Sequence, residues 1–235
     1  MAVARDTTLV GTGTVNGGTS VALSNFSTGG ANRLVLVTID NSNGASNFVV
    51  SSVTATGLTF TLVSSIEKWP GFGHTDVWEA WASSTQTNVA VTVNFTGAVQ
   101  GAARTYCFSG TISTGVASAA IGAIATNNWF SNGNPTTVDV TTTAANSLVI
   151  ASVGITGDTT LTAGTGQTND GTTTLAGQEA TNANLRQNSI TATSGTVVTM
   201  NGTLGTSKGW GIIGMEILEG TAPPPANTSN FFQFF

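Results

Sequence analysis

The sequence predicts an all-β protein, an antiparallel sandwich of short strands, and three observations carry this prediction. Only 7% of the residues are charged, so the chain lacks the Glu and Lys richness that long surface helices use. Glycine occupies 29 of the 235 positions, and Thr, Ser and Asn dominate the polar remainder, a composition typical of strands joined by tight turns. Hydrophobic residues make up 40% of the chain, which is enough for a core and argues against disorder.

Apolar or β-branched runs with period-two alternation recur between turn signals along the chain. In chain order, the predicted strands cover residues 19–24, 33–39, 48–54, 58–63, 76–82, 89–95, 103–108, 137–141, 147–155, 189–200 and 210–218. Breaks fall at turn-forming pairs such as Asn43-Gly44, Pro70-Gly71 and Asn132-Gly133. The polar segment 157–188 is expected to form either a pair of edge strands that contacts partners or a plain solvated edge.

The two halves of the chain echo each other weakly. The run that begins Asn32-Arg33-Leu34-Val35 resembles the one that begins Asn146-Ser147-Leu148-Val149. Two architectures fit this echo: tandem sandwiches, or a single jelly roll whose halves each supply strands to both sheets. The join at 115–134 is rich in Ala and Ile and is no linker, which favours one jelly-roll domain over residues 1–220. Residues 221–235 then form a Pro-rich linker and a C-terminal tail.

The tail is aromatic. Phe231, Phe232, Phe234 and Phe235 follow a run of three prolines. Burial of one phenylalanine side chain stabilises a structure by roughly 1.5–3 kcal/mol, so four docked rings could offset the ordering of a flexible linker. We therefore predict that these four residues bind a neighbouring subunit or another protein, with docking on the chain's own sheet as the alternative.

Aromatic side chains also gather in segment 69–81, which holds three of the five Trp residues and the only His. The loop expected at its start carries Trp69, Phe72 and His74, and a second expected loop carries Trp129. Aromatic rings stack on the apolar face of a sugar ring, so these four residues are candidates for a glycan-binding or interface surface. The alternative is that they pack over a sheet edge, meet a neighbouring subunit or close the end of the sandwich.

Interior positions are expected for at least one strand tryptophan and for the cysteine. Alternation places Trp78 and Trp81 on opposite faces of one strand, so at least one of them should enter the core. Cys107 is the only cysteine, which excludes an intrachain disulfide. We expect it to be a small buried hydrophobe.

No arrangement of residues indicates catalysis, and the protein is predicted not to be an enzyme. Glu67 and Glu79 are the nearest approach to a glycosidase pair, but both are interpreted as solvated. One His and one Cys cannot form a zinc site, and Asp158 and Asp170 lack the spacing of a calcium loop. No cofactor is expected, although a single calcium ion held by loop carbonyls stays open.

Charge and hydropathy exclude two classes of partner. The formal net charge is −5, with only six Lys and Arg residues and no basic cluster, so nucleic acid is not an expected ligand. No stretch is apolar enough to span a bilayer, and residues 1–6 are not followed by the apolar core of a secretory signal.

Five segments together resemble a jelly-roll domain that recurs in structural proteins of tailed bacteriophages and in bacterial surface proteins. They are the opening Val3-Ala4-Arg5-Asp6-Thr7-Thr8, the Asn-x-Leu-Val-Leu-Val strand that begins at Asn32, residues 53–59, Val77-Trp78-Glu79-Ala80-Trp81, and residues 103–110.

This resemblance implies a non-enzymatic virion structural protein, in the first place a capsid decoration (cement) protein. Such a protein would form a symmetric oligomer, bind neighbouring capsid subunits, and lie on the virion surface after assembly in the host cytoplasm. The alternative that it implies is a carbohydrate-binding or adhesin module of a head fibre, a tail fibre or a bacterial surface, which would be extracellular and take a glycan.

Overall fold

The structure is a computed structural model that describes residues 2–6, 9–43, 48–71, 73–112 and 114–220. In these residues the chain forms sixteen strands and one short 3-10 helix, η1 (Ala117–Ala120). All of the strand pairings are antiparallel. The prediction of an all-β antiparallel sandwich is confirmed. Within the described ranges, no helix is long and apolar enough to cross a membrane.

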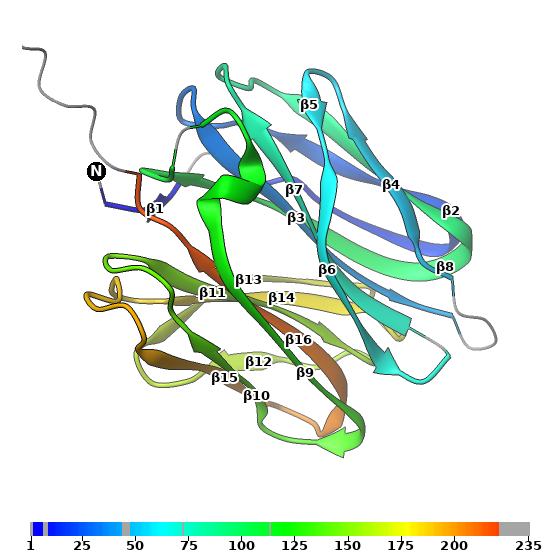
Figure 1. The fold of residues 1–235 in the computed structure, drawn as a ribbon. Helices are drawn as coiled ribbons and strands as arrows, with labels where there is room; N and C mark the ends of the chain where they lie inside the picture. The colour runs from blue at the N-terminus through cyan, green and yellow to red at the C-terminus, as the bar shows by residue number, and fades with distance from the viewer. Residues whose placement is uncertain (1, 7–8, 44–47, 72, 113, 221–235) are drawn as a thin grey trace, which may run out of the picture.

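The first half of the chain forms one eight-stranded sheet, in the order β5-β4-β8-β3-β7-β6, with β1 and β2 also paired to β8. Its strands are β1 (Ala4–Arg5), β2 (Thr12–Phe26), β3 (Arg33–Ser42), β4 (Val50–Ala55), β5 (Leu58–Thr59), β6 (Thr61–Trp69), β7 (Gly73–Ala82) and β8 (Val89–Ser109). β2 pairs with residues 89–104 of β8, whereas β4 pairs with residues 91–95 and β3 with residues 100–108. The sheet therefore folds over itself into a first sandwich, drawn in blue to green in Figure 1.

The second half forms a second sandwich of two sheets, in the orders β13-β14-β11-β16-β9 and β10-β15-β12. Its strands are β9 (Ile121–Gly133), β10 (Thr136–Thr141), β11 (Leu148–Ile155), β12 (Leu161–Ala163), β13 (Gln167–Thr174), β14 (Thr181–Gln187), β15 (Val197–Leu204) and β16 (Lys208–Ile217). Among the described residues, no sheet takes strands from both halves of the chain. The two halves of the chain thus form tandem sandwiches, one of the two architectures that fit the sequence.

The echo in the sequence corresponds to this repetition. Asn32 and Asn146 precede β3 and β11, and both adopt the left-handed conformation, with φ of 56° and 58°. Each of the two strands lies inside its sheet, β3 between β7 and β8 and β11 between β14 and β16. The similar runs therefore build equivalent central strands.

The sandwiches are joined because β3 and β11 are buried on both faces. Val37 of β3 points into the core of the first sandwich, and Val149 of β11 points into the core of the second. Their chain neighbours Leu36 and Ile150 point the opposite way, into a third core between the sandwiches, which also includes Ile213 of β16. We call this the shared core. It stacks the two sandwiches face to face (Figure 1).

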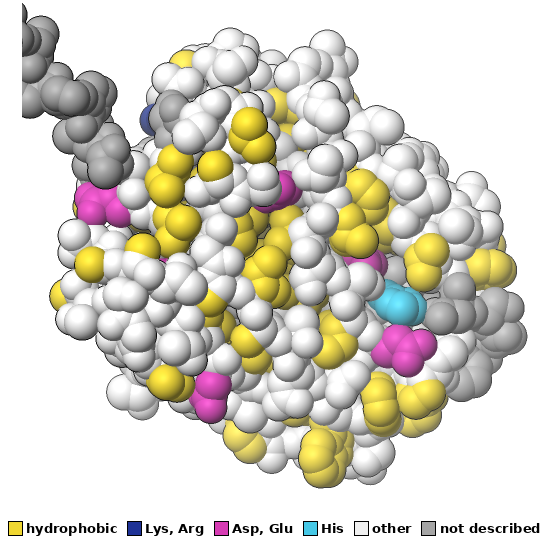
Figure 2. All heavy atoms as spheres, in the orientation of Figure 1, with side chains coloured by type: hydrophobic (Ala, Val, Ile, Leu, Met, Phe, Trp, Pro, Cys, Tyr) yellow, Lys and Arg dark blue, Asp and Glu magenta, His cyan; other side chains and the backbone are white. Residues whose placement is uncertain are grey.

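Edge strands of the two sandwiches lie next to each other on one face of the molecule. These are β6 of the first sandwich and β9 of the second, in the middle of the view in Figure 1. The side-chain amide Nδ2 of Asn128 on β9 donates a hydrogen bond to the carbonyl oxygen of Glu67 on β6, at 2.6 Å. Hydrophobic side chains reach the surface over the middle of this face (Figure 2).

Several predicted elements differ from the structure. Residues 89–95 and 103–108 belong to one strand, β8, and the stretch 189–200 becomes a strand only from Val197. The segment 157–188 forms β12, β13 and β14: β12 and β13 are edge strands, as expected, but β14 lies inside its sheet with its first five residues buried. Strand β9 was not predicted, because its second half is polar and exposed and shows no clear alternation.

The interior side chains follow the prediction, with one exception. Trp78 packs against the core of the first sandwich and Trp81 against the shared core. Cys107 is buried, and burial raises the pKa of its thiol to about 12. Glu79, interpreted as solvated, is only 5% exposed, since β7 lies inside its sheet, and burial raises the pKa of its carboxyl group above the usual range.

Candidate functional site

The contact face between the sandwiches changes from apolar to charged along the strands. On this face β3 presents, in order, Leu34, Leu36, Thr38, Asp40 and Ser42. The facing strand β11 presents Leu148, Ile150, Ser152 and Gly154, followed by Thr156 beyond its end. Period-two alternation places each series on one side of its strand. The apolar members belong to the shared core, and the polar members lead to the open end of the interface.

A buried hydrogen-bond network follows the shared core. The hydroxyl of Thr38 donates to Oδ1 of Asn182 at 2.8 Å, and Nδ2 of Asn184 donates to the same hydroxyl at 3.0 Å. Nδ2 of Asn182 in turn donates to the hydroxyl of Ser152 at 3.3 Å. Because burial of an unpaired polar group costs stability, these bonds let polar side chains sit between two sandwiches.

Next along the interface lies a buried ion pair. Nζ of Lys68 is 2.6 Å from Oδ1 of Asp40, and both side chains are fully buried. Nζ also lies 3.2 Å from the carbonyl oxygen of Glu179 and 3.5 Å from that of Ile155, so one side chain of the first sandwich holds two segments of the second. Burial raises the pKa of Asp40 to about 7, although the Lys68 charge opposes this, and burial lowers the pKa of Lys68.

The ion pair has room because the facing position is a glycine. A Cβ on Gly154 would overlap the Asp40 carboxylate and the Thr75 hydroxyl. Only a residue without a side chain allows β11 to approach β3 and β7 this closely.

Asp76 is a second buried carboxyl group. It lies on the face of β7 opposite to Thr75, which points towards Gly154 of the second sandwich. It is 3% exposed, and Nδ2 of Asn41 lies 3.5 Å from its Oδ2. Burial raises the pKa of Asp76 from 3.8 to about 6, against a hydrogen bond from the Ser65 hydroxyl. A raised pKa in the folded state stabilises the fold below pH 3.8, and this contribution is lost as the pH rises through about 6.

We therefore expect Asp76→Asn to remove part of the pH dependence of stability. Relative to the variant, the wild-type free energy of unfolding should fall by about 2–3 kcal/mol between pH 4 and pH 7, since each unit of pKa shift is worth about 1.4 kcal/mol. Urea unfolding of both proteins at each pH measures this difference. Asp158→Asn, which removes an exposed carboxylate, is the control; a wild-type-to-Asp76→Asn difference that stays constant with pH contradicts the prediction.

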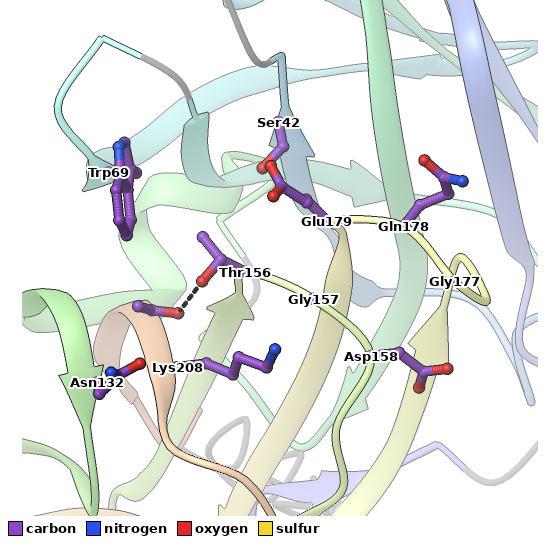
Figure 3. A pocket seen from close by; sticks show the side chains of 11 residues that line it. Ser42, Trp69, Asn132, Thr156, Gly157, Asp158, Gly177, Gln178, Glu179 and Lys208 are labelled. Atoms are coloured by element: carbon purple, nitrogen blue, oxygen red, sulfur yellow. Dashed lines mark hydrogen bonds between the residues drawn. The ribbon is translucent and has the colours of Figure 1, made fainter.

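Beyond the Lys68–Asp40 pair, the interface opens into a cleft of about 670 Å³ (Figure 3). The first sandwich contributes Ser42 and Trp69 to its lining, and the rest comes from the second: Asn132, Thr156, Gly157, Asp158, Gly177, Gln178, Glu179, Lys208 and Gly209. Figure 3 shows the Trp69 ring on one side of the cleft and Asp158 and Gln178 on the other. The volume lies within the usual range of small-molecule sites, roughly 300–1,000 Å³.

The walls of the cleft are fixed by close contacts. A Cβ on Gly209 would lie 3.1 Å from Cε3 of Trp69, so this glycine lets the indole ring lie against the backbone. Gly157 adopts a φ of +95°, and a Cβ there would lie 3.1 Å from Nζ of Lys208. On the far wall, Gln100 of β8 donates from Nε2 to Oε1 of Gln178.

Of the predicted site residues that the structure describes, Trp69 alone is found in this cleft, where it is 38% exposed. His74 lies in strand β7 and not on a loop, because β7 begins one residue earlier. It is largely buried, its Nδ1 lies 3.3 Å from the Ser65 hydroxyl, and burial lowers its pKa. Trp129 is 56% exposed on β9, beside Trp210, and does not line the cleft.

The remaining predicted site residues lie outside the described residues. They are Phe72 and the four tail residues Phe231, Phe232, Phe234 and Phe235.

Sequence reasoning missed the charged residues of the interface, although a signal was present. Asp40 continues the alternate series of Leu34, Leu36 and Thr38, and Lys68 alternates with Ile66 in the same way. Inward positions on two strands thus carried opposite charges. That pattern predicts a buried pair once the strands are known to be neighbours of one interface.

The described part of the chain contains no group of three or more His, Cys, Asp or Glu side chains arranged to hold a metal ion. Asp170, considered above for calcium, is paired with Arg186 at 2.8 Å and with Arg5 at 3.1 Å. Comparison of the chain with protein-family models, curated proteins and solved structures gave no match. The chemistry of the cleft is hydrogen bonding by donors and acceptors beside one aromatic ring.

Proposed function

We propose that this chain is a non-enzymatic structural protein of a bacteriophage virion surface, a capsid decoration protein that binds neighbouring capsid subunits. The observation that carries the proposal is the surface of strand β9. It is an edge strand, and it exposes Ile124 by 44%, Trp129 by 56% and Phe130 by 42%. An exposed strand edge with large apolar side chains favours pairing with another chain.

The adjacent edge strand extends this apolar surface onto the first sandwich. Leu62 of β6 is 51% exposed, and β6 contacts β9 through the hydrogen bond between Asn128 and Glu67. Ile124 and Trp129 point to opposite sides of β9, because their β16 partners Met215 and Trp210 belong to different cores. A neighbouring subunit that docks here would therefore contact both sides of the β6–β9 edge, which the shared core holds in place. Large apolar side chains at the centre of an interface are the ones that contribute most to binding.

The low charge of the chain and its resemblance to phage structural domains support the same role. A chain with only 7% charged residues suits repeated contacts between like subunits, since few charges need to be desolvated. The protein would form a symmetric oligomer on the virion after assembly in the host cytoplasm.

We expect that changing both Trp129 and Phe130 to Ser weakens self-association at least tenfold, because truncation of two interface aromatics costs more than about 1.4 kcal/mol. Light-scattering mass over a concentration series measures the dissociation constant. The same measurements are made on a chain that ends at Gly220. This truncated chain should form smaller assemblies by light scattering, or should no longer co-sediment with phage particles released by cells that carry the gene.

Val197→Ser is the matched control for this experiment. Val197 is 58% exposed on β15, away from β9, and the change likewise replaces an apolar side chain by a polar one. A full-length chain that is monomeric at every concentration, and that sediments with no particle, overturns the proposal. The proposal is also overturned if Val197→Ser weakens self-association as much as the double change of Trp129 and Phe130.

One observation favours a second candidate function, a carbohydrate-binding or adhesin module. It is the presence of Trp69 in a cleft lined by polar side chains.

A further inference from the structure

We propose that the cleft between the two sandwiches is a binding site for a neutral saccharide. This inference rests on the second candidate function and gives it a site. It differs from the surface expected from the sequence, because His74 and Trp129 are not part of it and the second sandwich supplies most of its lining.

Trp69 supplies the apolar half of saccharide recognition. Its ring is 38% exposed at a cleft that is otherwise lined by polar side chains and glycines. A pyranose presents C–H groups on one face and hydroxyls around its rim, so it can stack on an indole while its edge stays hydrogen-bonded. The contact of the ring with Gly209 fixes one side of the ring and leaves the other for a ligand.

The polar lining supplies the other half. Asn132 and Gln178 carry amides that both donate and accept, Asp158 and Glu179 accept, and Lys208 donates. Sugar hydroxyls also donate and accept, so they match a mixed set of this kind. Two carboxylates against one ammonium group leave one net negative charge, which disfavours phosphates, sulfates and acidic sugars. The lining therefore selects neutral sugars.

The cleft is formed before any ligand arrives. Gln100 of the first sandwich donates a hydrogen bond to the side chain of Gln178. Oε1 of Gln100 also accepts a hydrogen bond from the backbone N–H of Glu179 at 3.1 Å. The buried Lys68 holds the carbonyl of Glu179 from below, at 3.2 Å. The wall that faces Trp69 is thus held at three points by the other sandwich. A preorganised wall loses little conformational entropy when a ligand binds.

The test is a glycan array probed with the labelled full-length chain, followed by titration of the retained neutral glycans. We expect Trp69→Ala to weaken binding at least tenfold. Val197→Ala is the control, because it truncates an exposed apolar side chain that lies outside both the cleft and strand β9, and it should bind within about twofold of wild type. Trp69→Phe, which keeps an aromatic face, should recover most of the affinity.

Circular dichroism and thermal melting establish that each variant is folded. Three results overturn the inference: retention of no glycan by the wild type, retention of acidic glycans alone, or equal losses of affinity in Trp69→Ala and Val197→Ala. Light-scattering mass of Trp69→Ala separates this inference from the assembly role. A variant that assembles normally but no longer binds sugar supports the site, and a wild type that assembles without binding any sugar overturns the site alone.

Discussion

Lys68→Met should lower the free energy of unfolding by roughly 3–5 kcal/mol at pH 8, the range found when one partner of a buried ion pair is removed. The variant leaves the fully buried Asp40 without its counter-ion at 2.6 Å. It also removes the donor that reaches the carbonyl of Glu179 in the second sandwich. The loss should shrink at pH 5, because Asp40 can then be buried in its protonated form. Urea unfolding at both pH values measures the effect.

Two further variants make this prediction specific. Lys208→Met removes the only other lysine, which is half-buried in the cleft and has no ion pair among the described residues, so it should change stability by no more than about 0.5 kcal/mol. The double variant Asp40→Asn with Lys68→Met should be more stable than Lys68→Met alone, since no charge is left buried. The prediction is wrong if Lys68→Met and Lys208→Met have the same effect.

Glu216→Gln should cost about 3 kcal/mol, because this carboxylate accepts four hydrogen bonds in a fully buried site. The donors are the backbone N–H groups of Ala123, Thr143 and Ala144 and the hydroxyl of Thr143, at 2.7–3.0 Å. A glutamine keeps one oxygen but turns an NH₂ group towards N–H donors. The change therefore removes acceptors from the start of β9 and from the connection between β10 and β11.

The same site predicts an acid sensitivity. Burial alone would raise the pKa of Glu216, but the hydrogen bonds from Ala123 and Thr143 outweigh it, and the pKa lies below its usual 4.5. A lowered pKa gives stability that is present above pH 4.5 and lost as the pH falls through the folded-state value. The difference between wild type and Glu216→Gln should thus narrow below pH 4.5. Glu179→Gln, the same change at an exposed site, should have little effect at any pH; a pH-independent difference for Glu216→Gln contradicts the prediction.

These two sites stabilise different contacts. Glu216 holds a loop onto its own sandwich, whereas Lys68 and Asp40 join the two sandwiches next to the cleft. The interface closes where Leu36 and Ile150 meet and opens beyond the charged pair. Side chains at the interface thus change from apolar to polar along β3 and β11. The apolar end holds the two sandwiches together, and the polar end can bind a ligand.

The all-β class and most of the strands could be predicted from the amino-acid sequence. Alternation and turn residues are local properties, so they mark β3, β7, β11 and β16 without knowledge of their neighbours. They also placed Trp78 and Trp81 on opposite faces of one strand. The echo around Asn32 and Asn146 marked the two equivalent central strands for the same reason, since each left-handed Asn begins a run with the same pattern.

The division of the strands among the sheets, and the residues that face each other between the sandwiches, could not be predicted in this way. Period-two alternation marks a strand with one buried and one exposed face. Both faces of β3 and β11 are buried, so the pattern could not reveal the shared core between the sandwiches. Asp40 and Lys68 are 28 positions apart, and Trp69 meets the segment around Lys208 from the other sandwich. The ion pair and the cleft arise from the stacking of two sheets, and a stacking contact between distant segments leaves no periodic trace in either one.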